Sequence, residues 1–263
     1  MNLITLTTDF GTQDWFAATM KGVILGLCPR AAIVDITHEI PAGDIRAGAF
    51  ALMASHRFFP KGTVHVAVVD PGVGSARHAI AVQTASHFFV GPDNGVLSLA
   101  LAKGKIKTIR RLENAGSFLQ PVSRTFHGRD IFAPVAARLC RGSPIHQLGP
   151  PQQGFVRLRW SEPRMQRQGI EGEVVYIDRF GNLTTNIEEK YLPDVSLEHC
   201  RLDIGRRRNI PLASHYQAVP TGREVALIGS GGLLEIAVNG GSASQRLGLK
   251  IGSTFRIRRV QLA

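Results

Sequence analysis

The stretch Val66-Ala67-Val68-Val69-Asp70-Pro71-Gly72-Val73-Gly74-Ser75-Ala76-Arg77-His78 decides the fold of the chain. Residues 64–69 are apolar and rich in valine, which predicts a buried strand. The strand stops at Asp70, and the proline and glycines that follow favour a sharp turn. Open α/β sheets place their functional groups at such strand ends. The simpler alternative is that Asp70 only stabilises the turn and pairs with Arg77.

The sequence around this stretch alternates between strand and helix patterns. Leu3–Thr8 and Ala32–Ile36 read as strands, and apolar residues recur at helical spacing from Phe16 to Leu27. This alternation predicts an α/β fold with a mostly parallel sheet and helices on both sides. Polar loops follow the strands or open the helices, and such loops gather at one edge of a parallel sheet. They comprise residues 9–14, 70–77 and 125–130.

The pattern changes after the Pro- and Gly-rich stretch Leu148–Gly154. Beyond it come short strands and turns, among them a predicted strand at Val156–Trp160, and helical periodicity is scarce. A small antiparallel barrel or sandwich fits this pattern. We therefore predict an N-terminal α/β domain (residues 1–150), a linker (151–168) and a C-terminal antiparallel β-barrel domain (169–263).

The composition narrows the function classes. The 263 residues carry a net charge of +11, which raises the prospect of an anionic partner. The basic clusters are short and scattered, without a basic helix or an RNA-binding signature, so nucleic-acid binding is disfavoured. Three distant cysteines argue against a zinc site or disulfide framework and fit a reducing, cytoplasmic location. The sequence has no signal-peptide pattern and no apolar run of the ~20 residues that span a membrane.

Several polar residues are candidates for a site. Asp9 and Asp14 share one loop, where a carboxylate suits a ribose diol or an ammonium group; capping and turn roles are the alternative. His127 precedes a helix and by itself suggests a structural role. Together with Asp70 and Arg77 it forms a base, a cation and an imidazole, which is a common catalytic set.

The second half of the chain contributes two further motifs. In Asp178–Asn182, Phe180 can stack on a flat ring, Asn182 can bind an amide-like edge and Asp178 can take a cation. The alternative is a hairpin turn. The glycine-rich segment Gly229–Gly241 permits close approach of a ligand, or simply softens a hairpin. It is no dinucleotide fingerprint, because no helix opens after it.

Five motifs in order resemble the S-adenosyl-L-methionine hydroxide adenosyltransferases, which are hydrolytic relatives of the fluorinases and chlorinases. The resemblance runs from Leu3 to about Phe255. The motifs are Thr8-Asp9-Phe10-Gly11, Asp70-Pro71-Gly72-Val73-Gly74, Gly91-Pro92-Asp93-Asn94-Gly95, Thr125-Phe126-His127-Gly128-Arg129-Asp130 and Asp178-Arg179-Phe180-Gly181-Asn182.

The resemblance implies an enzyme that cleaves S-adenosyl-L-methionine (SAM) with water, giving adenosine and L-methionine by in-line attack at the ribose C5′. SAM is the substrate, and neither a cofactor nor a metal is expected. The resemblance also implies a homotrimer, with each site between the N-terminal domain of one subunit and the C-terminal domain of the next. No membrane or nucleic-acid partner is expected.

The resemblance assigns a role to each candidate residue. Asp70, Arg77 and His127 resemble the water-activating triad, and Asp9 resembles the ligand of the ribose diol. The remaining positions resemble contacts to methionine (Asp14, Asp178 and Ser230) and to adenine (Phe180, Asn182 and the backbone at Asn239 and Gly240).

Two alternative functions stay open from the sequence, a SAM-dependent halogenase and a non-catalytic adenosine- or SAM-binding protein. The halogenating relatives carry an aromatic hydroxyl where Asp70 stands, a Trp where Gly43 stands and an Arg where Gly231 stands. The fluorinases also have an inserted loop near Thr84. A protein that only binds has no need of the triad.

Overall fold

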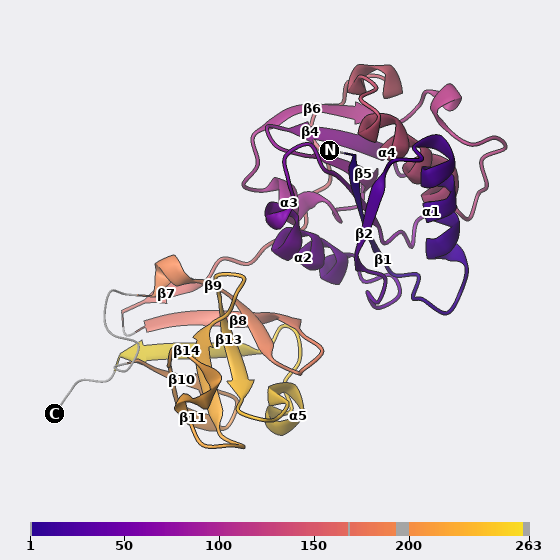
Figure 1. Cartoon of the computed structure of the whole chain (residues 1–263). Helices are drawn as coiled ribbons and strands as arrows, with labels where there is room; N and C mark the ends of the chain where they lie inside the picture. The colour runs from indigo at the N-terminus through magenta and orange to yellow at the C-terminus, as the bar shows by residue number, and fades with distance from the viewer. Residues whose placement is uncertain (1, 168, 193–199, 260–263) are drawn as a thin grey trace. The chain divides into compact units, whose positions relative to one another are not determined.

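The computed structural model describes residues 2–167, 169–192 and 200–259. The chain forms two compact units, Met1–Leu158 and Arg159–Ala263. Figure 1 shows the first unit as a sheet with helices and the second as a mostly antiparallel β structure.

The sheet of the first unit has the strand order β2-β1-β3-β5-β4-β6. The pairs β1–β2, β1–β3 and β3–β5 are parallel, whereas β4 runs antiparallel to β5 and β6. The predicted mostly parallel sheet is therefore confirmed. The strands are β1 (Leu3–Thr8), β2 (Ala32–Thr37), β3 (Val64–Val68), β4 (Ala79–Thr84), β5 (Phe88–Pro92) and β6 (Ile106–Arg111).

Helices cover both faces of this sheet. The central strands β1 and β3 are therefore buried on both sides. α1 packs against α4 on one face, where Met20 and Ile24 join a core with Ile4 and Leu6. α2 packs with α3 on the other face, and its Gly48 leaves no room for a Cβ beside Val69. The helices are α1 (Phe16–Leu27), α2 (Ile45–Ser55), α3 (Ser98–Leu101) and α4 (Ala133–Cys140).

The second unit is a nearly closed antiparallel barrel, as the sequence predicted. Its strand order is β11-β10-β14-β8-β9-β13-β12, with β7 also paired to β8. A bridge between Leu212 and Ala226 brings β11 and β12 together. The elements are β7 (Arg164–Gln166), β8 (Gly169–Ile177), β9 (Leu183–Glu188), β10 (Cys200–Ile204), β11 (Arg207–Pro211), β12 (Glu224–Ile228), β13 (Leu233–Val238), α5 (Ala243–Leu247) and β14 (Thr254–Arg259).

Two local interpretations of the sequence are wrong, and a short helix, α5, follows the glycine-rich segment where none was expected. Val156–Trp160 alternates like a strand but is not paired as one, because a strand needs a partner that no local pattern supplies. α1 begins after Trp15 without a side-chain cap, so Asp14 does not cap it.

A cluster of imidazoles lies in the core of the first unit. His65 on β3 is fully buried and its ring centroid lies 4.9 Å from that of His87 and 6.1 Å from that of His56. Its Nδ1 is 2.8 Å from the Thr5 hydroxyl oxygen. Burial, followed by the charges that His87 and His56 would carry, lowers the pKa of His65 to about 3.

This cluster predicts a loss of stability in mild acid. The unfolded chain binds a proton at His65 near pH 6.5, whereas the folded chain does so only near pH 3. The unfolded state therefore binds more protons between these values, and stability falls as pH drops through 6.5. Each pH unit in this window costs about 1.4 kcal/mol. Urea unfolding at pH 7.5 and 5.5 measures this change in the free energy of unfolding. H65Q should make the free energy of unfolding less dependent on pH, and the exposed-site control H146Q should not. An unchanged slope in H65Q would contradict the assignment.

Candidate active site

Asp70 and Arg77 meet across the turn that follows β3. The turn closes with a hydrogen bond from the Val73 amide to the Asp70 carbonyl at 3.1 Å. Gly74 has a φ of +76°, and a Cβ there would lie 2.3 Å from the Arg124 carbonyl oxygen, so glycine is required. Arg77 Nε donates to Asp70 Oδ1 at 2.9 Å, and its Nη2 donates to Oδ2. This bidentate pair is mostly buried, with 5% of the Asp70 side chain exposed.

The same guanidinium reaches His127. Arg77 Nη2 lies 2.8 Å from His127 Nδ1. Because a guanidinium can only donate, Nδ1 is the acceptor and the neutral ring carries its proton on Nε2. Burial and the Arg77 charge lower the pKa of His127, although Asp70 and Asp130 act to raise it. His127 is therefore an uncharged donor near neutral pH.

His127 lies directly before a helical turn of unusual geometry. Gly128–Phe132 forms one π-helical turn before α4, a feature that often marks functional sites. Asp130 in this turn is buried and accepts a hydrogen bond from the Ser123 amide at 2.8 Å. It also accepts hydrogen bonds from Nε and Nη2 of Arg129. These bonds hold the segment that carries His127.

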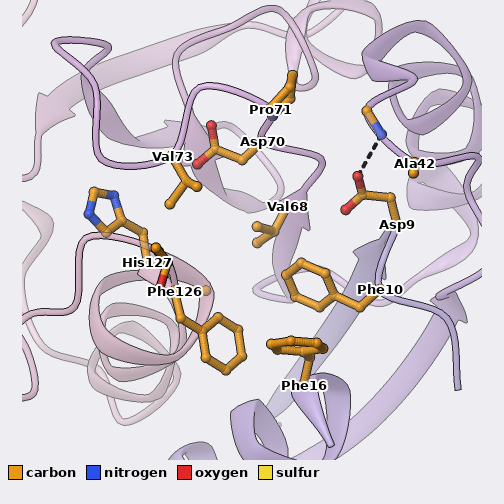
Figure 2. A pocket seen from close by; sticks show the side chains of 13 residues that line it. Asp9, Phe10, Phe16, Ala42, Val68, Asp70, Pro71, Val73, Phe126 and His127 are labelled. Atoms are coloured by element: carbon orange, nitrogen blue, oxygen red, sulfur yellow. Dashed lines mark hydrogen bonds between the residues drawn. The ribbon is translucent and has the colours of Figure 1, made fainter. Parts of the chain in front are cut away.

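A pocket of about 490 Å³ brings together the three loops that the sequence singled out. Figure 2 shows Asp9, Asp70 and His127 around it, with the rings of Phe10, Phe16 and Phe126 forming one wall. Asp9 Oδ2 accepts the Gly43 amide at 2.8 Å. The remaining lining residues are Ala42, Gly43, Val68, Pro71, Val73, Thr125 and Gly128.

The phenylalanine wall was missed by sequence reasoning. The ring centroids of Phe10, Phe16 and Phe126 lie 5.1 to 5.7 Å apart. Phe16 counts as a core residue in the helical pattern, and only the fold turns it toward a pocket. Asp14, in contrast, is exposed and lies outside the lining of this pocket.

The Asp178–Asn182 motif forms a tight turn in the second unit. Asp178 accepts the Asn182 amide through Oδ1 at 2.8 Å and the Asn182 side-chain Nδ2 through Oδ2 at 2.9 Å. Gly181 has a φ of +84°, and a Cβ there would overlap Ser242. The turn leaves the Phe180 ring 77% exposed. The hairpin alternative thus describes the backbone correctly while the ring remains available for binding.

A second pocket, of about 690 Å³, lies beside this turn. Phe180, Asn182, Asn239 and Gly240 line it, whereas Asp178 and Ser230 are not among its lining residues. The Asn239 side-chain Nδ2 donates to the Val219 carbonyl at 2.8 Å. The pocket is completed by His215, Tyr216, Gln217, Val238 and Gly241.

Tyr216 is a lining residue that no sequence pattern indicated. Its hydroxyl donates to Glu235 Oε1 at 2.7 Å. Burial and this bond raise the pKa of Tyr216 to about 12, and burial raises the pKa of Glu235. The ring of Tyr216 is thereby held at the pocket. A lone tyrosine in a loop carries no periodicity, so the sequence offered no signal.

Within the described ranges, no group of three or more His, Cys, Asp or Glu side chains is arranged to ligate a metal ion. In the same part of the chain, no helix combines the length and apolarity needed to cross a membrane.

Comparisons with known proteins identify the family of the chain. The model for the SAM hydroxide adenosyltransferase N-terminal domain matches residues 4–149, and the model for the C-terminal domain matches residues 172–256. The chain therefore belongs to the SAM hydroxide adenosyltransferase family.

Individual relatives are similar over the full length. A protein from Thermus thermophilus named (R)-S-adenosyl-L-methionine hydrolase is 40% identical, covering 98% of this chain and 100% of the relative. A crystal structure of an uncharacterized conserved protein from Thermotoga maritima superposes with a TM-score of 0.92 at 38% identity, covering 98% of this chain and 100% of that one. A fluorinase from Actinoplanes is 26% identical, with 97% of both chains covered.

The Arg77 contact predicts how His127 titrates. The variant R77M should raise the pKa of His127, because it removes a cation that opposes protonation. D70N should lower the pKa, because it removes an anion that favours protonation. A ¹H NMR titration of the imidazole signal, assigned by its loss in H127Q, measures both shifts. A His127 pKa that is the same in R77M, D70N and the wild type would rule out the contact.

Proposed function

We propose that this protein hydrolyses S-adenosyl-L-methionine to adenosine and L-methionine. The full-length similarity to a named SAM hydrolase supports the reaction. One observation carries the assignment of the chemistry: Asp70 and His127 both line the pocket, and Arg77 contacts each of them. This arrangement supplies a base, a cation and a neutral donor beside one pocket.

In the proposed mechanism, Asp70 accepts a proton from water as the water attacks. Deprotonating water beforehand at neutral pH would cost about 12 kcal/mol. Transfer during attack avoids most of this cost. Arg77 holds both oxygens of Asp70, and its charge stabilises the developing hydroxide. His127, with its proton on Nε2, donates a hydrogen bond that orients the water oxygen.

The water attacks the ribose C5′ in line with the departing sulfur. The C5′–O bond forms as the C5′–S bond breaks, and the sulfonium leaves as neutral methionine. A nucleophile that gains negative charge meets a cation, so charge is lost in the transition state, and a water-poor pocket favours this. The neutral leaving group requires no acid and no Lewis acid. We therefore propose catalysis without a metal or cofactor.

The substrate contacts follow the family resemblance. Asp9 accepts the ribose hydroxyls with the oxygen that the Gly43 amide leaves free. Phe180 stacks on the adenine, and Asn182 binds its edge with the amide carbonyl. The remaining proposed contacts are Asp14, Asp178 and Ser230 to methionine, and the backbone at Asn239 and Gly240 to adenine.

Halide chemistry is disfavoured by the charge of Asp70. A halide about 4 Å from a carboxylate would be repelled by about 4 kcal/mol at an intermediate dielectric. Water suffers no such repulsion and can donate to the same carboxylate. The fluorinase relative is also less similar to this chain than the hydrolase relative is.

The decisive experiment follows oxygen-18 from solvent into product. With SAM in H₂¹⁸O, the label should enter the 5′-hydroxyl of adenosine, and EDTA should leave the rate unchanged. D70N should lower kcat by about 10²- to 10⁴-fold, as expected for loss of a general base, and should still bind adenosine. E113Q, which neutralises a carboxylate of an exposed ion pair, is the matched control.

Three outcomes would contradict the proposal. Normal turnover in D70N would remove Asp70 from the chemistry. Formation of 5′-halo-5′-deoxyadenosine with chloride or fluoride would favour the halogenase alternative. Tight SAM binding without product would favour the binding-protein alternative.

We also propose the assembly and location that the resemblance implies. The protein forms a homotrimer in which the N-terminal half of one subunit and the C-terminal half of the next share each site, without a nucleic-acid partner. Two separate lined pockets, one on each half of the chain, support a shared site. A cytoplasmic location is supported by Cys28, Cys140 and Cys200, which form no disulfide.

Subunit mixing tests the shared site. Light scattering should give three times the chain mass of 28.6 kDa. D70N and F180A should each be poorly active, and their co-expressed mixture should regain activity, because some sites then combine two unaltered halves. Phe180 is suited to this test because its ring is exposed and its loss should not disturb the core. A monomer, or a mixture with no regain, would contradict the shared site.

A further inference from the structure

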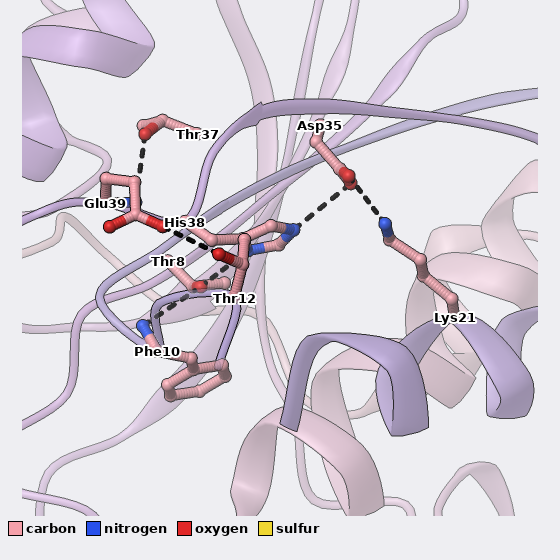
Figure 3. Close-up of polar contacts among 8 residues, drawn as sticks. All are labelled: Thr8, Phe10, Thr12, Lys21, Asp35, Thr37, His38 and Glu39. Atoms are coloured by element: carbon pink, nitrogen blue, oxygen red, sulfur yellow. Dashed lines mark hydrogen bonds and ion pairs between the residues drawn. The ribbon is translucent and has the colours of Figure 1, made fainter. Parts of the chain in front are cut away.

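A polar network with a buried inner end lies beneath the loop that carries Asp9. The Thr8 hydroxyl oxygen is 2.7 Å from His38 Nδ1, and both residues are buried. On the far side of the ring, His38 Nε2 lies 3.2 Å from Asp35 Oδ1, and Lys21 Nζ lies 2.5 Å from Asp35 Oδ2. Figure 3 shows this series of contacts, which runs from Lys21 on the surface of α1 to Thr8 at the end of β1.

The contacts of the network are compatible with a neutral His38 ring that carries its proton on Nε2. The Phe10 amide donates to the Thr8 hydroxyl oxygen at 3.3 Å. The Thr8 hydroxyl can then donate its own hydrogen to His38 Nδ1, which leaves the ring proton on Nε2 facing the Asp35 carboxylate. Burial acts to raise the pKa of Asp35, but Lys21 and His38 outweigh it and lower this pKa. Asp35 therefore stays ionised and favours this tautomer.

Backbone contacts join the Asp9 loop to the segment after β2. The Gly11 amide donates to the His38 carbonyl at 2.7 Å, and the Ile40 amide donates to the Thr8 carbonyl at 3.4 Å. The Gly43 amide binds the Asp9 carboxylate itself. The Thr8–His38 bond is the side-chain contact at the base of this loop pair, directly next to Asp9.

A nucleophilic role for Thr8 does not fit this geometry. Hydroxyl, imidazole and carboxylate follow one another as in a hydrolase triad. Thr8 has no exposed surface, however, and its oxygen already accepts the Phe10 amide. A substrate cannot reach that oxygen.

We infer that Thr8 and His38 are positioning residues that fix the orientation of Asp9 toward the ribose of the substrate. The inference rests on the proposed function, in which Asp9 accepts the ribose hydroxyls. Asp35 and Lys21 support His38 by holding its tautomer. Loss of the Thr8–His38 bond should let the Asp9 loop move while the sheet stays folded, because β1 remains paired on both sides.

The chain supplies a matched control on the same strand. The Thr5 hydroxyl makes the same kind of buried contact with His65 Nδ1, at 2.8 Å, and Thr5 is outside the pocket lining. T8V and T5V therefore each remove one buried threonine–histidine bond with little change in shape. T8S retains the hydroxyl at position 8, and H38N retains an acceptor near the Nδ1 position. H38L has no hydrogen-bonding group at position 38.

The readout is the preference for adenosine over 2′-deoxyadenosine, measured by calorimetry on the full chain, together with KM for SAM. T8V and H38L should lower the preference and raise KM by about tenfold, as expected for a weakened hydrogen bond to a charged group. T8S and H38N should stay near the wild-type values. T5V should lower the melting temperature about as much as T8V and leave the preference unchanged.

The outcomes separate this inference from the proposed function. If the wild type prefers adenosine and T8V keeps that preference, the positioning role is wrong and the function stands. If T5V lowers the preference as much as T8V, the effect is general destabilisation and the inference is also wrong. If the wild type neither hydrolyses SAM nor distinguishes the two nucleosides, the proposed function fails and the inference falls with it.

Discussion

The structure of the first unit's site depends on the contacts of one guanidinium. Arg77 binds both oxygens of Asp70 and also reaches the ring of His127. It thereby fixes the orientation of the carboxylate, and its charge, together with burial, opposes protonation of the imidazole. With 11% of the Arg77 side chain exposed, water and salt screen these contacts weakly. These contacts hold the three groups in fixed relative positions, which is the condition for electrostatic preorganisation.

The parallel pairing of β1 and β3 explains why the remaining groups converge there. Thr8 lies opposite Val68 in this pair, so both strands end at the same edge of the sheet. Asp9 and Asp70 follow these ends and enter one pocket. Rigid strands therefore set the separation of the two carboxylates, and the loops adjust only their orientation. The network around His38 has a related role, because it anchors the loop that carries Asp9.

The part of the site that could be predicted was encoded locally. A valine-rich run that ends in Asp-Pro-Gly is enough to place a carboxylate at a strand end, and Arg77 lies seven residues further on. The rest depended on contacts distant in sequence. His38 lies 30 residues from Thr8, and nothing in its neighbourhood marks it. Tyr216 and the phenylalanine wall could not be predicted for the same reason. A side chain becomes part of a pocket only when another segment packs beside it.

By itself, the sequence determined the α/β unit, the β-barrel after it and the order of the motifs, because periodicity, turn residues and strand ends depend on neighbours in the chain. Only the tertiary structure decided the hydrogen-bond partners of His127 and His38, the aromatic wall and the exclusion of Asp14 from the first pocket. Those properties depend on burial and on distances between segments far apart in sequence. Hydrogen-bond partners and desolvation exist only once the chain has folded.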